Sequence, residues 1–464
     1  MSYYAIVTQL KDVRPHPNAD RLQLATVFGN TVCVDLTYAE GQLGVYFPTG
    51  GQLSVKFAEV NNLLRKKDAE GNNIGGYMDP DKRNVTAIKL RGEKSDGLFM
   101  PLKCLESFGD ISNLTSGDRI DVFNGEEICT KYIPKTNARR GHVSDGNRTR
   151  KHTVPLAPTF VEHADTEQLA YNLGAFKHGD EIEITLKMHG TSQRTGHLKV
   201  LTGYKKTFWD KLFKREGTPI YDWGYVSGTR RVVLDTFDGG FYGSNEFRKQ
   251  HHDAFVGKLW KGETVYYEVV GYTHTGAPIM GNGNNEKLGK DFVKQYGKET
   301  VFSYGCTPTG EHIMYGNDGI SDFAIPFPMP VSDIYVYRMT MTNEDGDVVE
   351  YTPDFMRYRC EQMGIKTVPV FAKDIIPKWP SVNADCDPID AGEYVKNLAE
   401  QYYAGPDPVG KTHTREGVVV RIINRPKFCA YKHKNFEFKV LEGIISEKLA
   451  ESTTEIAEDV LAEM

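Results

Sequence analysis

Lys187 stands at the end of a β-type run and could act as a nucleophile. The residues before it, from Glu181 to Leu186, alternate polar and apolar side chains and include β-branched residues, which predicts a strand that ends at the lysine. A lysine side chain is protonated at neutral pH, so attack on a phosphorus atom requires burial, a nearby cation or a metal to favour the neutral amine. Gly190 would let the backbone turn close to a ligand. An ordinary surface lysine is the alternative, because one short motif is not specific.

Further segments supply groups that phosphoryl-transfer chemistry uses. Arg230 and Arg231 end a small-residue turn, where either guanidinium could clamp a phosphate; a solvated basic turn is the alternative. Glu268 lies inside an apolar run, where an unpaired charge is costly, so it is a candidate ligand for a ribose hydroxyl or a metal-bound water. Tyr337 could stack on a base, although a tyrosine of the core would show the same pattern.

Two more charged residues complete an ordered set. Glu416 stands just before an apolar run, and Lys439 lies in a later one. Together with the residues above, they resemble the motifs of the covalent nucleotidyltransferases. His189 is similar to the RNA ligase branch, because DNA ligases and capping enzymes usually carry aspartate there, and residues 364–370 also resemble a segment common in RNA ligases. The resemblance therefore points to an ATP-dependent RNA ligase.

This resemblance implies three phosphoryl-transfer steps, which begin when Lys187 attacks the α-phosphorus of ATP. The lysyl-AMP would pass AMP to the 5′-phosphate of an RNA end, and a 3′-hydroxyl would then displace AMP. Glu416 and Glu268 would hold Mg²⁺ or Mn²⁺, while positioning and electrostatics would supply most of the catalysis. The catalytic residues that the resemblance implies are Lys187, His189, Arg230, Glu416 and Lys439. The implied ATP- or AMP-binding residues are Leu186, Gly190, Glu268, Tyr337, Lys434 and Lys439.

The last motif departs from the usual family pattern. Many relatives carry a Lys-x-Lys pair where this chain has Glu437 and Lys439. A second cation must therefore come from Lys432, Lys434 or elsewhere.

The N-terminal part shows a second resemblance. Residues 16–22 and 88–98 are similar to the tRNA-binding OB-fold modules attached to some aminoacyl-tRNA synthetases. Short β-branched runs broken by Gly-rich turns fit a small β-barrel there. An OB module ahead of a ligase core resembles the RNA ligases of the Deinococcus and Naegleria type.

We therefore expect an α+β chain of four parts. An OB-like β-barrel that binds nucleic acid would occupy residues 1–130, and a basic linker would occupy 131–156. An ATP-grasp-like antiparallel-sheet nucleotidyltransferase domain would follow at 157–442, and an acidic helical tail would end the chain at 443–464. The stretch 273–330, rich in Gly, Asn and Pro, is expected to be an insertion or lid of open role.

A negative net charge does not exclude RNA, because phosphate contacts need only a local basic strip. The 464 residues carry a net charge of −6. Arg139 and Arg140 nevertheless lie in the basic linker, and Lys205 and Lys206 begin a segment rich in Phe and Trp, so either cluster could contact RNA. The alternatives are a solvated linker and an amphipathic helix packed on the core.

The composition favours a soluble protein in a reducing compartment. The seven cysteines are scattered without a Cys-x-x-Cys pair, so neither a disulfide framework nor a structural zinc is predicted. No apolar run approaches the roughly 20 residues needed to cross a bilayer, and the N-terminus predicts no signal peptide. We expect a cytoplasmic monomer, of a microbe or of a phage or virus acting in its host.

The expected partner is RNA with 3′-hydroxyl and 5′-phosphate ends, in a nicked duplex or a broken tRNA, and the expected role is RNA repair. A DNA ligase or an mRNA-capping guanylyltransferase would share the lysine chemistry but differ in nucleotide and acceptor. A non-catalytic RNA-binding protein on a ligase-like core would form no lysyl-AMP. The intact set of Lys187, Glu268, Glu416 and Lys439 argues against a loss of activity.

Overall fold

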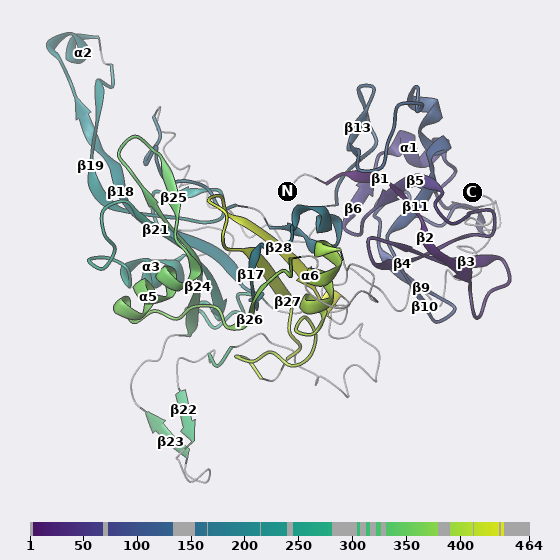
Figure 1. Ribbon diagram of the computed structural model, residues 1–464. Coiled ribbons are helices and arrows are strands. Elements are labelled where there is room, and N and C mark those ends of the chain that lie inside the picture. The colour runs from purple at the N-terminus through teal and green to yellow at the C-terminus, as the bar shows by residue number, and fades with distance from the viewer. Residues whose placement is uncertain are drawn as a thin grey trace. The chain divides into compact units, whose positions relative to one another are not determined.

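The fold is that of a computed structural model of the chain (Figure 1). The residues that the structure describes are 3–67, 73–132, 154–164, 166–213, 215–238, 245–280, 304–306, 312–315, 322–325, 331–378, 390–411, 413–435 and 438–439. They form two compact units. The first unit holds the described residues up to 132 together with Lys439, and the second holds the described residues from 154 to 438.

The first unit packs short antiparallel sheets around one apolar core. Its largest sheet has the strand order β11-β5-β1-β12, and a second has the order β2-β3-β4. The core includes Val45, Phe47 and Phe57, which are fully buried. The elements are β1 (Ala5–Gln9), β2 (Lys11–Pro15), β3 (Leu22–Val27), β4 (Asn30–Asp35), β5 (Leu43–Phe47), β6 (Gly51–Leu53), α1 (Val55–Val60), β7 (Lys66–Lys67), β8 (Asn73–Gly75), β9 (Ala87–Leu90), β10 (Glu93–Asp96), β11 (Leu98–Pro101), η1 (Leu102–Phe108), β12 (Arg119–Ile120), β13 (Val122–Phe123), β14 (Glu126–Glu127) and β15 (Cys129–Lys131).

A six-stranded antiparallel sheet, ordered β20-β19-β18-β21-β24-β25, forms one half of the second unit. One of its faces packs on two helices, where Phe247, Val265, Tyr267, Val336 and Met356 share a core. The elements are β18 (Thr191–Lys205), α2 (Phe208–Leu212), β19 (Thr218–Gly228), β20 (Val233–Leu234), α3 (Glu246–Asp253), β21 (Glu263–Gly271), β24 (Ser332–Thr342), β25 (Val348–Glu350) and α5 (Pro353–Met363).

A five-stranded sheet, ordered β16-β28-β27-β17-β26, forms the other half. Only the β16–β28 pair of this sheet is parallel. Ile182, Ile184, Val418 and Val420 pack against Val395 of the covering helix. The remaining elements are β16 (Glu167–Gln168), η2 (Leu169–Tyr171), η3 (Leu173–Ala175), β17 (Glu181–Leu186), the pair β22 (His312–Tyr315) and β23 (Asp322–Ile325), β26 (Val370–Ile375), α6 (Ala391–Glu400), β27 (Gly417–Ile422) and β28 (Cys429–Lys434).

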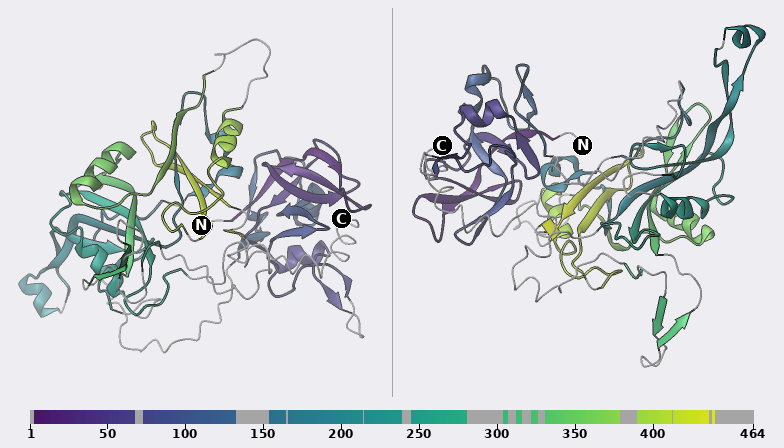
Figure 2. Two further views of the ribbon diagram at one scale, coloured as in Figure 1. Left: turned by 90° about the horizontal axis from the view of Figure 1, so that it is seen from below. Right: turned by 180° about the vertical axis from the view of Figure 1, so that it is seen from behind.

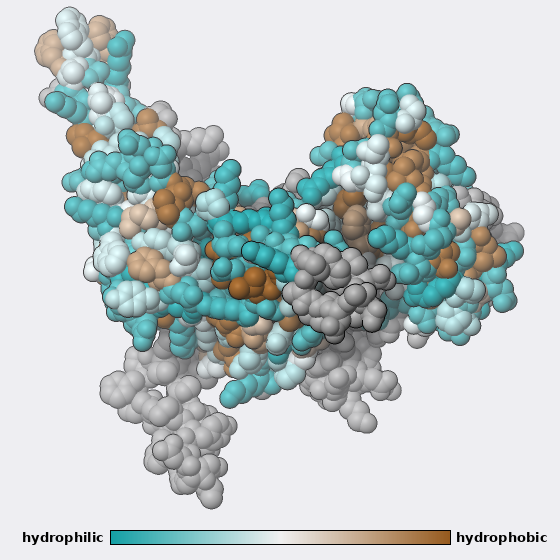
Figure 3. Space-filling view, in the orientation of Figure 1, coloured by the Kyte–Doolittle hydropathy of each residue, from teal (hydrophilic) through white to brown (hydrophobic). Residues whose placement is uncertain are grey.

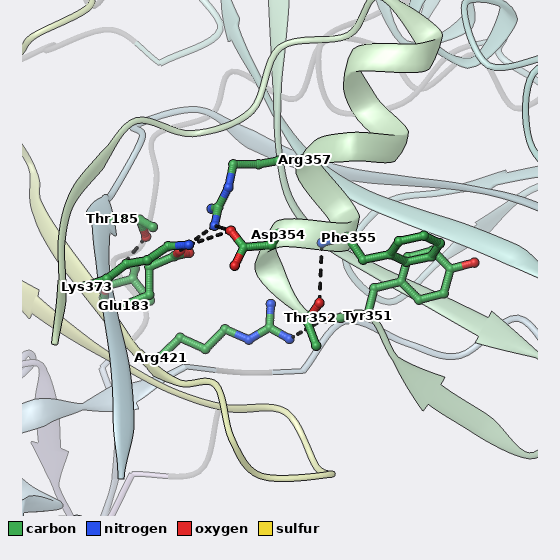
Figure 4. Close-up of polar contacts among 10 residues, drawn as sticks. Glu183, Thr185, Tyr351, Thr352, Asp354, Phe355, Arg357, Lys373 and Arg421 are labelled. Carbon is green, nitrogen blue, oxygen red and sulfur yellow. Dashed lines mark hydrogen bonds and ion pairs between the residues drawn. The ribbon is translucent and has the colours of Figure 1, made fainter. Parts of the chain in front are cut away.

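Ion pairs tie helix α5 to the five-stranded sheet (Figure 4). Arg357 of α5 lies 2.8 Å from the buried carboxylate of Glu183 on β17, and it also pairs with Asp354. Lys373 of β26 reaches the same two carboxylates. The Arg421 guanidinium donates a hydrogen bond of 3.0 Å to the backbone oxygen of Tyr351. These contacts fix β17 against the helix that packs on the six-stranded sheet.

A β-bulge in β24 redirects a predicted functional side chain. Tyr267 of β21 faces Val336, whereas the neighbouring Tyr266 faces Arg338, so Tyr337 is an extra residue without an opposite partner. Val336 and Met339 both point into the core although they are three residues apart, and the bulge makes this odd spacing possible. Tyr337 therefore lies on the face opposite the core.

The predicted α+β character, with antiparallel sheets and few helices, is confirmed. The strands of the described first unit form separate small sheets and not one closed barrel. The predicted helical tail at 443–464 and residues 133–153 of the predicted linker lie outside the described residues. Within the described part of the chain, no helix has the length and apolar character that crossing a membrane requires.

Candidate active site

Lys187 directly follows strand β17, and backbone hydrogen bonds hold it from both sides. The N–H of Leu186 donates to the carbonyl of Pro369 at 2.9 Å, and the N–H of Lys187 donates to the carbonyl of Gly417 at 3.0 Å. The side chain of Lys187 keeps 23% of its surface exposed. The lysine is thus anchored through its backbone while its amine remains accessible.

The carboxylate of Glu416 gathers the charged groups of the site. Its Oε1 lies 2.7 Å from Nζ of Lys187 and 3.1 Å from Nζ of Lys434. Nδ1 of His189 lies 3.5 Å from the other oxygen, Oε2. Lys434 reaches this position because it pairs with Gly417 across the β27–β28 ladder. Of the lysines considered for the second cation, Lys434 contacts Glu416.

The surroundings keep Glu416 ionised. Burial by itself would raise the pKa of this carboxyl. The positive charges of Lys187 and Lys434, together with His189, outweigh burial and lower the pKa well below its ordinary value. A buried carboxylate is thus stabilised by two ammonium groups.

Glu268 is the second carboxylate of the site and has a different environment. It lies on β21 opposite Ser192, whose hydroxyl donates a hydrogen bond of 3.2 Å to Oε2. Burial raises the pKa of Glu268 to about 7, and the charge of Glu416 adds to this rise while Lys187 opposes it. Near neutral pH this side chain is therefore poised between its two protonation states, and a cation would favour the ionised one.

Two glycines permit the close approach of backbone segments. A Cβ atom on Gly190 would lie 2.3 Å from the carbonyl oxygen of Val269 on β21. A Cβ on Gly417 would lie 2.1 Å from the carbonyl oxygen of His433, and Gly417 has a φ of +144° that side chains disfavour. The site is compact because these positions carry no side chain.

Arg230 and Tyr337 lie together beside the carboxylates. The charge of Arg230 acts on the pKa of both Glu268 and Tyr337. The backbone carbonyl of Arg230 accepts hydrogen bonds from the Arg194 side chain and from the N–H of His163. The ring of His163 contacts the Tyr337 hydroxyl through Nε2. His163 thus connects the backbone of Arg230 to the side chain of Tyr337.

The buried position of His163 predicts a dependence of stability on pH. Burial, with the nearby charges of Arg230 and Arg338, lowers the pKa of His163 from 6.5 to about 4. Between these values the unfolded chain binds a proton that the folded chain does not, so stability is full above pH 6.5 and falls as the pH drops towards 4. The loss should reach about 3 kcal/mol.

A His163→Gln variant should therefore show a flatter profile of unfolding free energy between pH 6.5 and 4, as measured by urea denaturation. His178→Gln, at an exposed histidine, serves as the control. Equal slopes for His163→Gln and the unsubstituted protein would contradict the prediction.

Sequence reasoning missed Tyr304 and His413, which lie close to His189. The hydroxyl of Tyr304 accepts a hydrogen bond of 2.8 Å from the backbone N–H of His189. The ring of His413 packs edge-on against Tyr304 at 4.8 Å, and the ring of Phe438 packs edge-on against the His189 imidazole at 4.7 Å. His413 lies three residues before Glu416, so a histidine close to the motif was the available signal. Tyr304 falls in the stretch 273–330 and carried no such signal.

Replacing Tyr304 with phenylalanine should slow covalent nucleotide attachment about tenfold with little change in the KM for ATP. The substitution leaves the buried N–H of His189 without its acceptor, which costs about 1–3 kcal/mol, and loosens the turn that follows Lys187. Single-turnover labelling with ATP would measure this rate. Tyr221→Phe, which loses an exposed hydroxyl contact to the Pro155 carbonyl, should leave the rate unchanged. An unaltered rate in Tyr304→Phe would show that the turn does not need this bond.

The other predicted residues lie apart from this cluster or outside the described residues. Lys439 belongs to the first unit, where its Nζ lies 3.0 Å from the Asp96 carboxylate, so its α-phosphate contact stays a prediction. Lys205 and Lys206 lie at the far end of β18 and just beyond it. Arg139 and Arg140 lie outside the described residues.

Comparisons with known proteins give a match in structure but not in sequence. No protein-family model and no curated protein matches the chain. A variant of Naegleria gruberi RNA ligase with ATP and Mn matches at a TM-score of 0.53 and 15% identity, over 95% of this chain and 99% of that one. A second variant of the same enzyme, with AMP and Mn, matches at a TM-score of 0.53 and 16% identity, over 95% of this chain and 98% of that one.

The same enzyme with pyrophosphate matches at a TM-score of 0.51 and 16% identity, covering 94% of this chain and 97% of that one. The likeness spans nearly the full length of both chains. The predicted resemblance to RNA ligases is thereby confirmed at the level of the fold: this chain has the fold of Naegleria gruberi RNA ligase.

Proposed function

We propose that this chain is an ATP-dependent RNA ligase that joins a 3′-hydroxyl to a 5′-phosphate through a lysyl-AMP intermediate. The observation that carries the proposal is the placement of Lys187, which lies at the end of a sheet strand and 2.7 Å from a buried carboxylate. The neighbours in structure are RNA ligases with ATP, AMP and Mn. A nucleophilic lysine needs such a fixed position, and a bound metal or the neighbouring ammonium of Lys434 would favour its neutral form.

The first step forms a phosphorus–nitrogen bond. The neutral amine of Lys187 donates its lone pair to the α-phosphorus of ATP, and the bond between that phosphorus and the bridging oxygen breaks, so pyrophosphate leaves with the electron pair. The nitrogen then releases one proton to water. Lys434, whose amine lies 3.1 Å from Glu416, would contact the developing charge on the α-phosphate. Tyr337 would stack on adenine, and Glu268 would bind a ribose hydroxyl or support a metal shell.

The second and third steps return the lysine and seal the strand. A 5′-phosphate oxygen of RNA attacks the phosphorus of lysyl-AMP, and the phosphorus–nitrogen bond breaks to release the amine. The 3′-hydroxyl then attacks the 5′-phosphorus of the RNA, and AMP leaves. Arg230 would hold a phosphate during these exchanges, and His189 would lie near the phosphate or the leaving group.

The carboxylates fit a divalent metal ion. Glu268 and Glu416 offer oxygen donors, which Mg²⁺ and Mn²⁺ prefer. Burial and the charge of Glu416 raise the pKa of Glu268 to about 7, and a bound cation would favour its ionised form. Among the described residues no group of three or more His, Cys, Asp or Glu forms a ready metal cage, so phosphate oxygens and water would complete the shell. Bound there, the metal would neutralise phosphate charge and orient the leaving group.

The first unit would supply an RNA-binding surface. We assign residues 1–130 as an OB-like module because its short antiparallel sheets share one core. The likeness to RNA ligase structures also covers about 95% of the chain and so includes this part. A nicked duplex or a broken tRNA is the proposed substrate, in RNA repair. Deleting this unit should reduce the sealing of nicked duplexes.

Labelling with nucleotide tests the proposal directly. The full chain is incubated with α-labelled ATP or GTP and Mg²⁺ or Mn²⁺ beside Lys187→Ala, and denaturing electrophoresis follows. Label from ATP that is absent in Lys187→Ala supports the ligase. Label from GTP alone would redirect the assignment to a capping guanylyltransferase. If the protein is folded and not already adenylated but takes up no label, the remaining assignment is a non-catalytic RNA-binding protein. Sealing of nicked RNA against nicked DNA then separates RNA from DNA ligase activity.

A further inference from the structure

Strands β18 and β19 extend beyond the six-stranded sheet as a two-stranded arm. Strand β18 pairs with β21 only as far as Gly196, whereas its pairing with β19 continues to Lys205. The part beyond the β21 pairing, residues 197–205, spans about 30 Å at about 3.3 Å per residue. Figure 1 and the view from behind in Figure 2 show this hairpin projecting from its sheet with α2 at its end.

The end of the arm exposes large apolar side chains on a fixed turn. Phe208, Trp209, Leu212 and Phe213 are 72%, 62%, 58% and 60% exposed. The rings of Trp209 and Phe213 stack at 6.0 Å with an angle of 13° between their planes. A reciprocal pair of hydrogen bonds between Thr207 and Asp210 caps the short helix. The predicted alternative of a helix packed on the core is therefore wrong, because this helix stands in solvent.

Cationic side chains lie next to these rings. Lys205 and Lys206 are exposed on the strand end that leads into the helix, and the guanidinium of Arg215 lies 5.5 Å from the centre of the Phe213 ring. Apolar and hydrophilic surface lie side by side at this end of the arm (Figure 3). In a chain of net charge −6, this concentration of positive charge favours a polyanionic partner.

We propose that the end of this arm binds a single-stranded stretch of RNA that flanks the ends being joined. The proposal rests on the proposed ligase function and names a further contact with its substrate. Exposed aromatic planes stack on unpaired bases, and neighbouring lysines contact the phosphates between them. Strand β18 runs from Thr191, four residues after Lys187, to Lys205, so the arm reaches about 45 Å from the nucleophile along its strand. It therefore contacts RNA far from the junction.

The test compares paired variants of the full chain. Trp209→Ala with Phe213→Ala removes the stacked rings, and Lys205→Ala with Lys206→Ala removes two charges. The matched control is Tyr358→Ala with Lys249→Ala, an exposed aromatic and an exposed lysine on helices α5 and α3. The probe is a fluorescently labelled single-stranded RNA without a 5′-phosphate, with binding followed by anisotropy over a range of salt. Lysyl-AMP formation is measured separately with ATP alone.

The ring variant should raise the Kd for this RNA about tenfold or more. The lysine variant should lower the slope of log Kd against log salt by about 1.4. Both should form lysyl-AMP at the unaltered rate, and the sealing of a nick with an unpaired extension should suffer more than that of a fully paired nick. The control variant should change none of these.

A Kd within about twofold of the unsubstituted protein in both arm variants would overturn the proposal. The proposal would also be overturned if the arm variants bound RNA normally but lost binding to vesicles of anionic phospholipid, because the partner would then be a membrane. Normal RNA binding together with loss of a dimer in sedimentation would likewise overturn it, because the partner would then be a second copy of the chain. If the unsubstituted protein forms no lysyl-AMP, the ligase function fails, while the anisotropy data still decide whether the arm binds RNA.

Discussion

Replacing Glu416 with glutamine should reduce the rate of lysyl-AMP formation by about 100- to 1,000-fold. The carboxylate is 2% exposed and lies within 3.1 Å of the amines of both Lys187 and Lys434. Glutamine fills the same space but carries no charge, so the two neighbouring ammonium groups would repel each other and lose their common anchor. Single-turnover labelling with α-labelled ATP at saturating metal would measure the rate.

A matched variant separates chemistry from stability in this test. Glu263 is also fully buried, and the Arg359 guanidinium contacts both of its oxygens at 2.8 Å. Glu263→Gln and Glu416→Gln should each lower the unfolding free energy by about 3 kcal/mol, because each breaks a buried ion pair. Only Glu416→Gln should lose nucleotide attachment per folded molecule. Equal rates for the two variants would refute a catalytic role for Glu416.

The second large effect is expected for Gly417→Ala. A methyl group there would lie 2.1 Å from the carbonyl oxygen of His433 and 2.8 Å from Cα of Lys434, and these backbone atoms cannot rotate away. The φ of +144° adds conformational strain to the clash. We expect the unfolding free energy to fall by about 3 kcal/mol or more.

The same substitution should abolish nucleotide attachment even where the protein stays folded, because β27 and β28 would separate and carry Glu416 away from Lys434. Urea denaturation and ATP labelling on the same preparation would show both effects. Gly174→Ala is the control, because a Cβ at this position has no neighbour within 4 Å. Full labelling in Gly417→Ala would mean that the strands tolerate a wider separation.

The charged centre could be predicted from the sequence because its members lie at strand ends. Lys187 follows an alternating strand and Glu416 precedes an apolar one, and these two strands pair with each other. Local pattern and chain order therefore placed both residues in one site. The source of the second cation stayed open between Lys432, Lys434 and a residue elsewhere, because the pairing of β28 with β27 is what brings Lys434 to the carboxylate.

The parts that depend on packing could not be predicted in this way. Tyr304 reaches the N–H of His189 from a segment far along the chain, and no local pattern reports such a contact. The sequence predicts Tyr337 as a base-stacking side chain, but the β-bulge that sets the direction of this side chain cannot be recognised from the pattern of polar and apolar residues in the strand. The five residues of α2 have enough aromatic side chains for a core helix, yet they stand at the end of an arm.

The sharing of one Glu416 oxygen by two lysines has a consequence for the complete reaction cycle. If Lys187 carries AMP as proposed, its nitrogen is no longer an ammonium, and the carboxylate loses one of its two lysine partners. Lys434 remains beside it, so a counter-ion persists through the covalent stage. On transfer of AMP to RNA, the released amine would take up a proton from water and pair again with Glu416 as an ammonium ion. The carboxylate that pairs with the free lysine would thus also stabilise the protonated amine as the leaving group of the proposed second step.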